Sequence, residues 1–543
     1  MSGERARQFD YIIVGAGSAG CALASRLTEH GRHTVLVLEA GGLDRNLWVR
    51  MPIGYGKTFY HPRLNWRYRT DPVEGLNGRV AYCPRGRVLG GSSSINAMVF
   101  IRGQHEDFDD WAALGNPGWS HADLLPLFRR MEDNLAGADA WRGTGGPLTV
   151  SNIDALAHPL CRHFIDAGIE LGFPHNADFK RQAQDGVGLY QVTVDRGLRA
   201  SAATAYLRPA MRRSNLTVAT NATVTRVLFE GRRAVGVAYE QGGRMLTAHA
   251  GREVVLSAGA INSPQLLQLS GVGDPEFLRG KGIDVVHALP GVGANLQDHV
   301  CIDYIYRANR PTLNDVLRPW WSQMLLGARY LLTRSGPLAL SVNQAGGFVR
   351  TGPGAERPNL QLYFSPLSYL RATPGKRQLM RPDPYPGFLL SVSNCHPTSR
   401  GYVCIRSADP REAPEIQPRY LSTERDVREL VEGARLMRRL ASTRSMRAII
   451  EAEVMPGPEV ASLEAIVDDI RSRAGSVFHP CGTCAMGPDP STAVVDPRLR
   501  VHGLDGLRIA DASIFPLLIA GNTNAASIMV GEKAFELMRG EPD

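Results

Sequence analysis

Lysine is scarce in this chain of 543 residues, whereas arginine is abundant. Of 61 basic side chains, 56 are arginines and only five are lysines, at Lys57, Lys180, Lys281, Lys376 and Lys533. The 61 basic and 53 acidic residues give a net charge of +8. The arginines are scattered among the acidic residues rather than gathered into a run. Because nucleic-acid-binding surfaces are basic patches or stripes, we do not expect nucleic acid as a partner.

Long apolar runs and a dense cysteine framework are also missing. The chain contains no stretch of about 20 apolar residues, the length that is needed to span a bilayer. The polar residues 1–8 lead directly into an apolar strand pattern, without the regions of a signal peptide. Eight cysteines in so long a chain do not resemble a small disulfide scaffold. We expect free thiols and a cytoplasmic protein, with peripheral contact on the inner membrane face left open.

The remaining composition is that of an ordinary globular protein. Hydrophobic residues make up 43% and charged residues 21% of the chain, which is enough for a large core. At roughly 100–200 residues per domain the length predicts three or four units, or two interleaved domains.

A glycine-rich turn follows the first apolar run. Residues 11–14 predict a strand, and the turn that contains Gly15, Gly17 and Gly20 leads into a helix over 21–29. A second strand over 34–38 ends at Glu39. In such a unit the first glycine allows a tight turn, the second admits the pyrophosphate and the third lets the helix pack on the strand. The acid at the end of the second strand can accept hydrogen bonds from an adenosine ribose.

Further along, the pattern alternates between helices and strands. A helix is predicted over 160–171, and residues 301–473 predict a mostly antiparallel sheet with covering helices. Additional strands and a closing helix are predicted at residues 216–219, 224–229, 235–239, 254–257, 507–511 and 527–537. Trp320, Met324, Ala328 and Leu331 recur at helical spacing. The simplest interpretation is a helix packed on the core, with a membrane-surface patch as the alternative.

One histidine stands apart from the other thirteen. His479 lies in a turn-rich stretch where Pro480 and Gly482 restrict the backbone, so its imidazole is held on a constrained loop. A histidine base works near neutral pH. Cys481 and Cys484 have the spacing of a redox dithiol, but they do not follow the first strand of a thioredoxin-like unit, and a second zinc-ligand pair is missing.

Five motifs in this order resemble the glucose-methanol-choline (GMC) oxidoreductases, most closely the choline dehydrogenase-like and FAD-dependent alcohol dehydrogenase branch. They are the Gly15–Gly20 turn with residues 39–42, the loop 86–103, the segment 259–273, the His479 stretch and residues 521–524. The resemblance implies an α/β fold: a Rossmann-like FAD-binding domain with an inserted, mostly antiparallel α+β substrate domain. The implied FAD-binding parts are residues 1–155, 200–305 and 476–543, and the substrate parts are 156–199 and 306–475.

The resemblance also implies site residues. His479 matches the catalytic histidine and Asn524 its partner, and no metal is required. The implied FAD-binding residues are Gly15, Gly17, Ser18, Gly20, Glu39, Ala40, Arg87, Gly91, Ser92, Asn96, Met98, Val224, Ala258, Asp511, Ala512, Asn522 and Thr523. Some members carry a histidine linked covalently to the flavin where this chain has Ile95, so noncovalent FAD is expected.

The implied reaction oxidises an alcohol, in the first instance a primary alcohol, to the aldehyde. His479 takes the hydroxyl proton, Asn524 hydrogen-bonds the same oxygen and the hydride passes to flavin N5. The acceptor is a quinone or another carrier. An oxygen-reducing oxidase and a flavin-containing hydroxynitrile lyase remain alternatives. Residues that could approach the substrate are His299, Asn343, Gln344, Tyr363, Phe364, His396 and Phe478.

Overall fold

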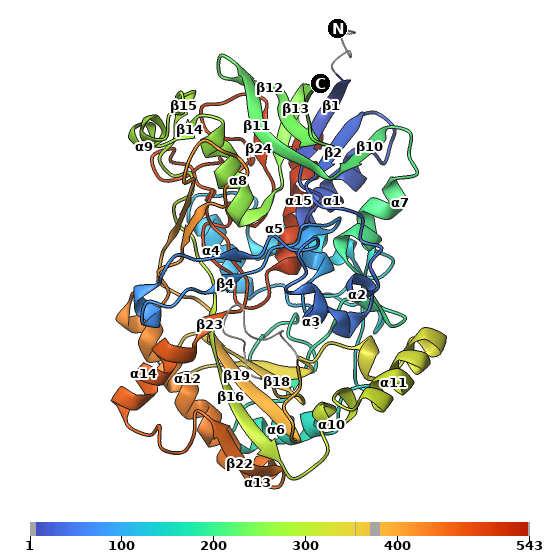
Figure 1. Ribbon diagram of the computed structural model, residues 1–543, viewed down its shortest axis with the longest axis vertical. Coiled ribbons are helices and arrows are strands. Elements are labelled where there is room, and N and C mark those ends of the chain that lie inside the picture. Colours follow the sequence, from blue (N-terminus) through green and yellow to red (C-terminus); the bar gives the residue numbers. More distant parts are fainter. Residues whose placement is uncertain (1–6, 353, 370–380, 541–543) are drawn as a thin grey trace.

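Two seven-stranded sheets dominate the computed structural model, which describes residues 7–352, 354–369 and 381–540. Figure 1 shows one sheet with its helices in the upper half of the molecule and the other in the lower half. Strands of the upper sheet come from both ends of the chain. The sequence prediction of an α/β fold with an inserted antiparallel part is confirmed.

The upper sheet has the order β10-β2-β1-β13-β12-β11, and β24 pairs with β13. Strands β10, β2, β1, β13 and β24 are parallel, whereas β11, β12 and β13 form an antiparallel meander. The bounds are β1 Arg7–Val14, β2 Val35–Glu39, β10 Leu216–Thr220, β11 Ala222–Glu230, β12 Arg233–Gln241, β13 Arg244–Leu256 and β24 Leu507–Ile509. Because β1, β2 and β10 are parallel, the ends of β1 and β2 place the glycine turn and Glu39 at one edge.

Small residues bring the first and last helices together. Helix α1 (Ser18–Leu27) packs against α15 (Asn524–Arg539), and a Cβ on Gly531 would lie 2.3 Å from the carbonyl oxygen of Ala19. Arg26 forms an ion pair at 2.9 Å with the buried carboxylate of Glu532. This close packing carries the loop before α15 to the glycine turn, although about 500 residues separate them in sequence.

The lower sheet is antiparallel throughout, in the order β22-β16-β19-β18-β17-β7, with β23 paired to β16. Its bounds are β7 Gly186–Leu189, β16 Val300–Ala308, β17 Ala345–Val349, β18 Leu360–Ser365, β19 Gly387–Asn394, β22 Ile450–Met455 and β23 Gly475–Ser476. Strands β17, β18 and β19 are buried along their whole length, because helices cover one face and the upper half of the molecule lies against the other.

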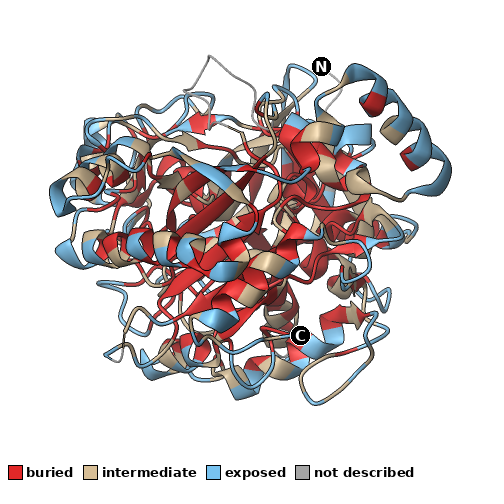
Figure 2. Cartoon of the chain, turned by 90° about the horizontal axis from the view of Figure 1, so that it is seen from below, coloured by how far each residue is buried: buried red, intermediate tan, exposed pale blue. Residues whose placement is uncertain are grey.

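Amphipathic helices complete both cores. The lower core combines the sheet with α6 (Leu160–Glu170), α12 (Glu424–Ser442) and α14 (Leu463–Arg473). The upper core adds α5 (His121–Met131) to α1 and α15. Figure 2 shows buried residues filling the centre of the molecule, with exposed residues at its rim.

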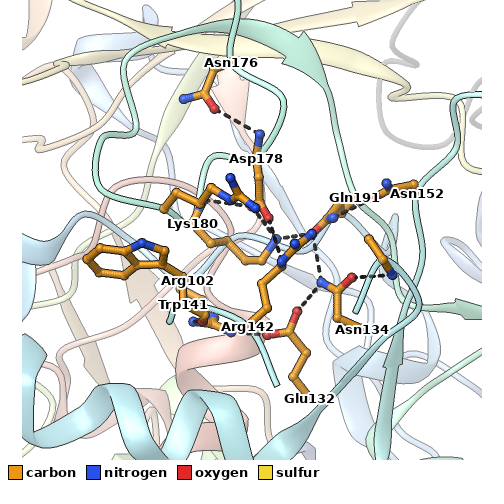
Figure 3. A network of polar contacts seen from close by, with 12 residues as sticks. Arg102, Glu132, Asn134, Trp141, Arg142, Asn152, Asn176, Asp178, Lys180 and Gln191 are labelled. Atoms are coloured by element: carbon orange, nitrogen blue, oxygen red, sulfur yellow. Dashed lines mark hydrogen bonds and ion pairs between the residues drawn. The ribbon is translucent and has the colours of Figure 1, made fainter. Parts of the chain in front are cut away.

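A buried polar network ties the segment before β7 to the upper half (Figure 3). Arg102 pairs with Glu132, and Lys180 contacts Asp178 at 2.6 Å and also Gln191. All five side chains are buried. Burial lowers the pKa of Lys180, although the adjacent Asp178 favours its charged form. Removing one side chain of an ion pair would leave a buried charge without its partner, which is costly. The network therefore holds the two halves in a fixed relative position.

Helix α11 (Trp320–Thr333) differs from the simplest sequence interpretation. The predicted helix is present, but it is not packed on the core: of its side chains only Ser322 and Tyr330 are buried. It projects at the lower right of Figure 1, and most of its large apolar residues are exposed. None of the helices within the described ranges has the length and hydropathy that crossing a bilayer demands.

Candidate active site

A cavity of about 1660 Å³ lies between the two sheets. The upper sheet and its loops form one wall, and Cys301, Asp303, Leu389 and Ser391 of the lower sheet form part of the other. The predicted site residues at its surface are Gly15, Gly17, Ser18, Glu39, Ala40, Arg87, Gly91, Ser92, Asn96, Met98, Val224, Ala258, His479, Asp511, Ala512, Asn522, Thr523 and Asn524. Of the predicted set, Gly20 alone does not line the cavity, which therefore gathers residues from nearly the whole sequence.

Close backbone contacts explain the glycines. Gly15 has φ +102°, and a Cβ there would lie 2.5 Å from the carbonyl oxygen of Ser257. A Cβ on Gly20 would lie 2.1 Å from the carbonyl oxygen of Gly15, so Gly20 acts in helix packing. At Gly91 a Cβ would lie 2.8 Å from the Cα of Gly17. The absent side chains leave backbone N–H groups at the N-terminus of α1 accessible to an anion such as a pyrophosphate.

Glu39 is the last residue of β2, and its carboxylate is buried. Its two oxygens accept hydrogen bonds from the backbone N–H groups of Ala16 at 3.0 Å and Gly41 at 2.8 Å. Burial raises the pKa of Glu39 to about 7, and the two hydrogen bonds oppose this effect. An acceptor at this position suits the hydroxyls of a ribose and disfavours a 2′-phosphate.

Hydrogen bonds hold the loop 86–103 in place around Asn96. Asn96 Oδ1 accepts hydrogen bonds from the N–H of Met98 at 3.1 Å and from the Arg199 guanidinium at 2.7 Å. Ile95 belongs to a small apolar cluster with Val49, Leu64 and Val88, and it also lines the cavity. The glycine cradle, the ribose-type acceptor and the cavity volume together fit an FAD molecule.

His479 is fixed by its own backbone. Its N–H donates to Asp298 Oδ1 at 2.7 Å, and the other oxygen of Asp298 accepts from Tyr420 Oη and Ser476 Oγ, at 2.6 and 2.5 Å. The preceding Phe478 has φ +71°, a conformation that costs energy for a bulky residue and is held by these contacts. Asp298 was not among the residues expected from the sequence.

A second histidine lies directly behind His479. The two Nδ1 atoms of His299 and His479 are 3.0 Å apart, and His299 Nε2 lies 2.9 Å from the carbonyl oxygen of Cys395. A carbonyl only accepts, so His299 Nε2 carries a proton. Burial lowers the pKa of His299 to about 4, so at neutral pH its Nδ1 has a lone pair. His479 Nδ1 therefore donates to it.

This arrangement defines which nitrogen of His479 can act as a base. Burial, assisted by His299 and Arg85, lowers the pKa of His479 well below the ordinary value. The neutral ring then holds its proton on Nδ1 and a lone pair on Nε2. That nitrogen accepts a hydrogen bond from Asn522 Nδ2 at 3.2 Å, and both residues line the cavity.

Asn522, rather than Asn524, contacts His479. Gln361 Nε2 donates to Asn522 Oδ1 at 3.3 Å, which turns Asn522 Nδ2 toward the imidazole. Asn524 is the first residue of α15, and its Oδ1 accepts from Ser18 Oγ at 2.8 Å. The sequence expectation that Asn524 pairs with His479 differs from this geometry, because two asparagines two residues apart in a turn cannot be told apart by spacing.

The other substrate-pocket candidates divide into two groups. Asn343, Tyr363 and Phe478 line the cavity, together with Phe59, Tyr60 and Tyr82, whose rings pack on one another. The candidates that do not line it are His299, Gln344, Phe364 and His396. His396 Nε2 instead contacts Asp107 at 2.7 Å, at a separate cavity.

The two cysteines after His479 do not form a reactive dithiol. Cys481 and Cys484 are both fully buried, and burial raises the pKa of each thiol well above its usual value. A thiolate is the reactive form, so neither is activated. In the described part of the chain, three or more His, Cys, Asp or Glu side chains do not come together in a metal-binding arrangement.

Comparison with known proteins identifies the family. Two family models for GMC oxidoreductases match, one at residues 9–301 and the other at 397–531. The chain belongs to the GMC oxidoreductase family. Members of this family are FAD-binding flavoproteins. Because the chain belongs to this family and its relatives are named alcohol and choline dehydrogenases, it is an enzyme that acts on CH–OH donors.

Relatives cover nearly the full length of this GMC oxidoreductase. It is 44% identical to an alcohol dehydrogenase (acceptor) of Pseudomonas putida, over 98% of this chain and 95% of the relative. It is 43% identical to the mitochondrial choline dehydrogenase of Homo sapiens, over 99% and 91%. The crystal structure of pyridoxine 4-oxidase from Mesorbium loti superposes with a TM-score of 0.89 at 31% identity, over 98% of this chain and 100% of that one.

Proposed function

We propose that this enzyme oxidises a primary alcohol to the aldehyde, with His479 as the general base. The alcohol hydroxyl replaces Asn522 Nδ2 as the partner of His479 Nε2, which takes the hydroxyl proton, and Asn522 Nδ2 donates its hydrogen bond to the alcohol oxygen instead. When bound, FAD supplies the acceptor for the hydride at its N5. The single observation that carries the proposal is that His479, whose Nε2 contacts Asn522, lines the same cavity as the glycine cradle and Glu39.

The surroundings of His479 suit proton abstraction. A buried, neutral imidazole is a ready acceptor at neutral pH, and the charge it acquires is balanced while the substrate oxygen carries negative charge. His299 holds the proton on Nδ1 and thereby keeps Nε2 as the acceptor. His299 is a positioning residue, because it touches His479 and does not line the cavity.

We further propose that FAD is bound without a covalent link, since Ile95 cannot form one. The electrons then pass to a quinone or another carrier; the Pseudomonas putida relative is named an alcohol dehydrogenase (acceptor), without a specified acceptor. Oxygen is the second candidate acceptor, which is favoured by relatives named oxygen-dependent choline dehydrogenases and by structures of oxidases.

The aromatic wall narrows the alcohols to be tested. Phe59, Tyr60, Tyr82 and Phe478 line one part of the cavity, with the Phe59 and Phe478 ring centroids 4.9 Å apart. Such a wall packs against apolar chains and rings, and it also attracts a quaternary ammonium. The test panel therefore contains choline, a medium-chain 1-alkanol and benzyl alcohol.

Anaerobic mixing tests the proposal. An alcohol substrate should bleach the oxidised flavin absorbance, and the matching aldehyde should be recovered in equal amount. A lyase or a binding protein would leave the flavin oxidised with every alcohol of the panel. Admitting oxygen, or adding a quinone analogue, then distinguishes the acceptors: rapid hydrogen peroxide formation identifies an oxidase, and quinone-dependent reoxidation identifies a dehydrogenase.

A further inference from the structure

Helix α11 turns a wide apolar side to solvent and a narrower face to the protein. The exposed fractions of Trp320, Trp321, Met324, Leu325, Leu331 and Leu332 range from 57% to 85%. The face that packs on the protein is formed by Ser322, Leu326 and Tyr330, which follow one another at helical spacing. Figure 2 shows this helix at the upper right, exposed along most of its length.

The exposed apolar side is continuous. At 100° per residue, the six apolar side chains fall within an arc of about 140°, opposite the buried face. Soluble proteins rarely display so many large apolar side chains on one helix without a partner. The helix itself is held firmly: Tyr330 Oη donates to the carbonyl oxygen of Gly197 at 2.8 Å, and its ring packs with Met51 and Ala339.

Positive charge frames the apolar arc. Arg318, Arg329 and Arg334 are exposed: Arg329 lies on the helix, about 40° beyond one border of the arc, and Arg318 and Arg334 flank the two ends of α11 in sequence. No acidic residue occurs in the sequence between Asp315 and Glu356. An apolar arc that includes two tryptophans, with arginines nearby and no acidic residue, is complementary to an anionic lipid surface.

A second copy of the chain fits this surface poorly. A two-fold contact through α11 would bring the arginines of both copies together without acidic partners. We propose that α11 is a docking element through which the enzyme lies on an anionic phospholipid membrane, with the apolar arc inserted among the headgroups and acyl chains. The proposal does not depend on the proposed alcohol oxidation, because α11 does not line the cavity.

Vesicle sedimentation tests the proposal with the purified holoenzyme. We expect it to sediment with phosphatidylcholine vesicles that contain about 30% phosphatidylglycerol, more weakly with phosphatidylcholine alone, and less at high salt. Trp321→Gln/Leu325→Gln/Leu332→Gln should weaken binding at least about tenfold, and Arg318→Gln/Arg329→Gln/Arg334→Gln should remove the preference for the anionic lipid.

The matched control is Leu135→Gln/Met245→Gln, which removes two other exposed apolar residues, 62% and 59% accessible, outside α11. It should bind vesicles as the unchanged enzyme does. All variants should retain flavin and their turnover with a soluble dye acceptor, which shows that they are folded. The proposal is overturned if the unchanged enzyme does not bind the anionic vesicles, if the α11 variants bind as well as the control, or if light scattering without lipid reveals a dimer that the apolar variant abolishes.

Discussion

His479 and His299 share one hydrogen bond between their Nδ1 atoms, which are 3.0 Å apart. Two neutral imidazoles can form such a bond only when one donates and the other accepts. The carbonyl of Cys395 on the far side of His299 decides the direction, since it can only accept. The backbone carbonyl of Cys395 therefore determines which nitrogen of His479 carries the lone pair, and this is the nitrogen proposed as the base.

Replacing His299 should change both the rate and the pH profile. His299→Gln keeps an acceptor for His479 Nδ1, whereas His299→Leu removes it, so flavin reduction should slow by about tenfold or more in His299→Leu and by less in His299→Gln. His479 works only when neutral, that is, above its pKa, and His299 helps to lower that pKa. In the pH profile of the flavin reduction rate, the acid limb is the region where the rate falls as His479 becomes protonated. This limb should thus lie below pH 6.5 in the unchanged enzyme and move to higher pH in His299→Gln. A purely structural role would lower the rate without moving the limb.

The two asparagines of the 521–524 turn should respond differently. Asn522→Ala removes the donor beside His479 Nε2 and should slow flavin reduction by about tenfold or more, with FAD still bound. Asn524→Ala loses a hydrogen bond to Ser18 at the glycine turn and should instead weaken FAD binding. Rapid-mixing kinetics and FAD titration of both variants check this. The assignment fails if Asn524→Ala is the slower of the two at saturating FAD.

FAD affinity should depend on the ionisation of Glu39. The carboxylate of Glu39 is a stronger hydrogen-bond acceptor when ionised, and burial raises its pKa to about 7. Affinity should therefore rise from about pH 6 to about pH 8, and Glu39→Gln should bind FAD at least about tenfold more weakly without this pH dependence. Fluorescence titration of the flavin-free protein measures both. Glu29→Gln, at an exposed position just beyond the end of α1, is the control; equal affinities for the two variants would refute the role of Glu39.

All flavin should leave the protein on acid denaturation. Ile95 occupies the position at which some relatives carry the linking histidine, and here it lies in an apolar cluster with Val49, Leu64 and Val88. Precipitation with acid should leave a colourless pellet and FAD of unchanged mass in the supernatant. Flavin retained in washed, denatured protein would contradict noncovalent binding.

Local patterns were predictable from the sequence. The Gly15–Gly20 turn, the strand ending at Glu39 and the helices near Leu160 and Ser527 depend on neighbouring residues, and the structure confirms each of them. The glycines could be assigned separate tasks because each absence of a side chain has a local geometric reason.

Contacts between distant segments were not predictable in the same way. His299 meets His479 across 180 positions, and no spacing rule connects a residue before β16 with one after β23. The choice between Asn522 and Asn524 depends on Gln361 in β18, which turns one amide toward His479. The outward orientation of α11 was only the alternative interpretation of the sequence, because periodicity identifies an apolar side without saying what covers it.

The most direct test of the account is anaerobic flavin reduction by His479→Ala, with a substrate from the alcohol panel. Because Nε2 of His479 is the proposed proton acceptor, the variant should keep its FAD and reduce it at least about a hundredfold more slowly than the unchanged enzyme. His163→Ala, which alters a histidine bonded to the Ser445 carbonyl in the lower half, should reduce flavin normally. Near-normal flavin reduction by His479→Ala would contradict the account.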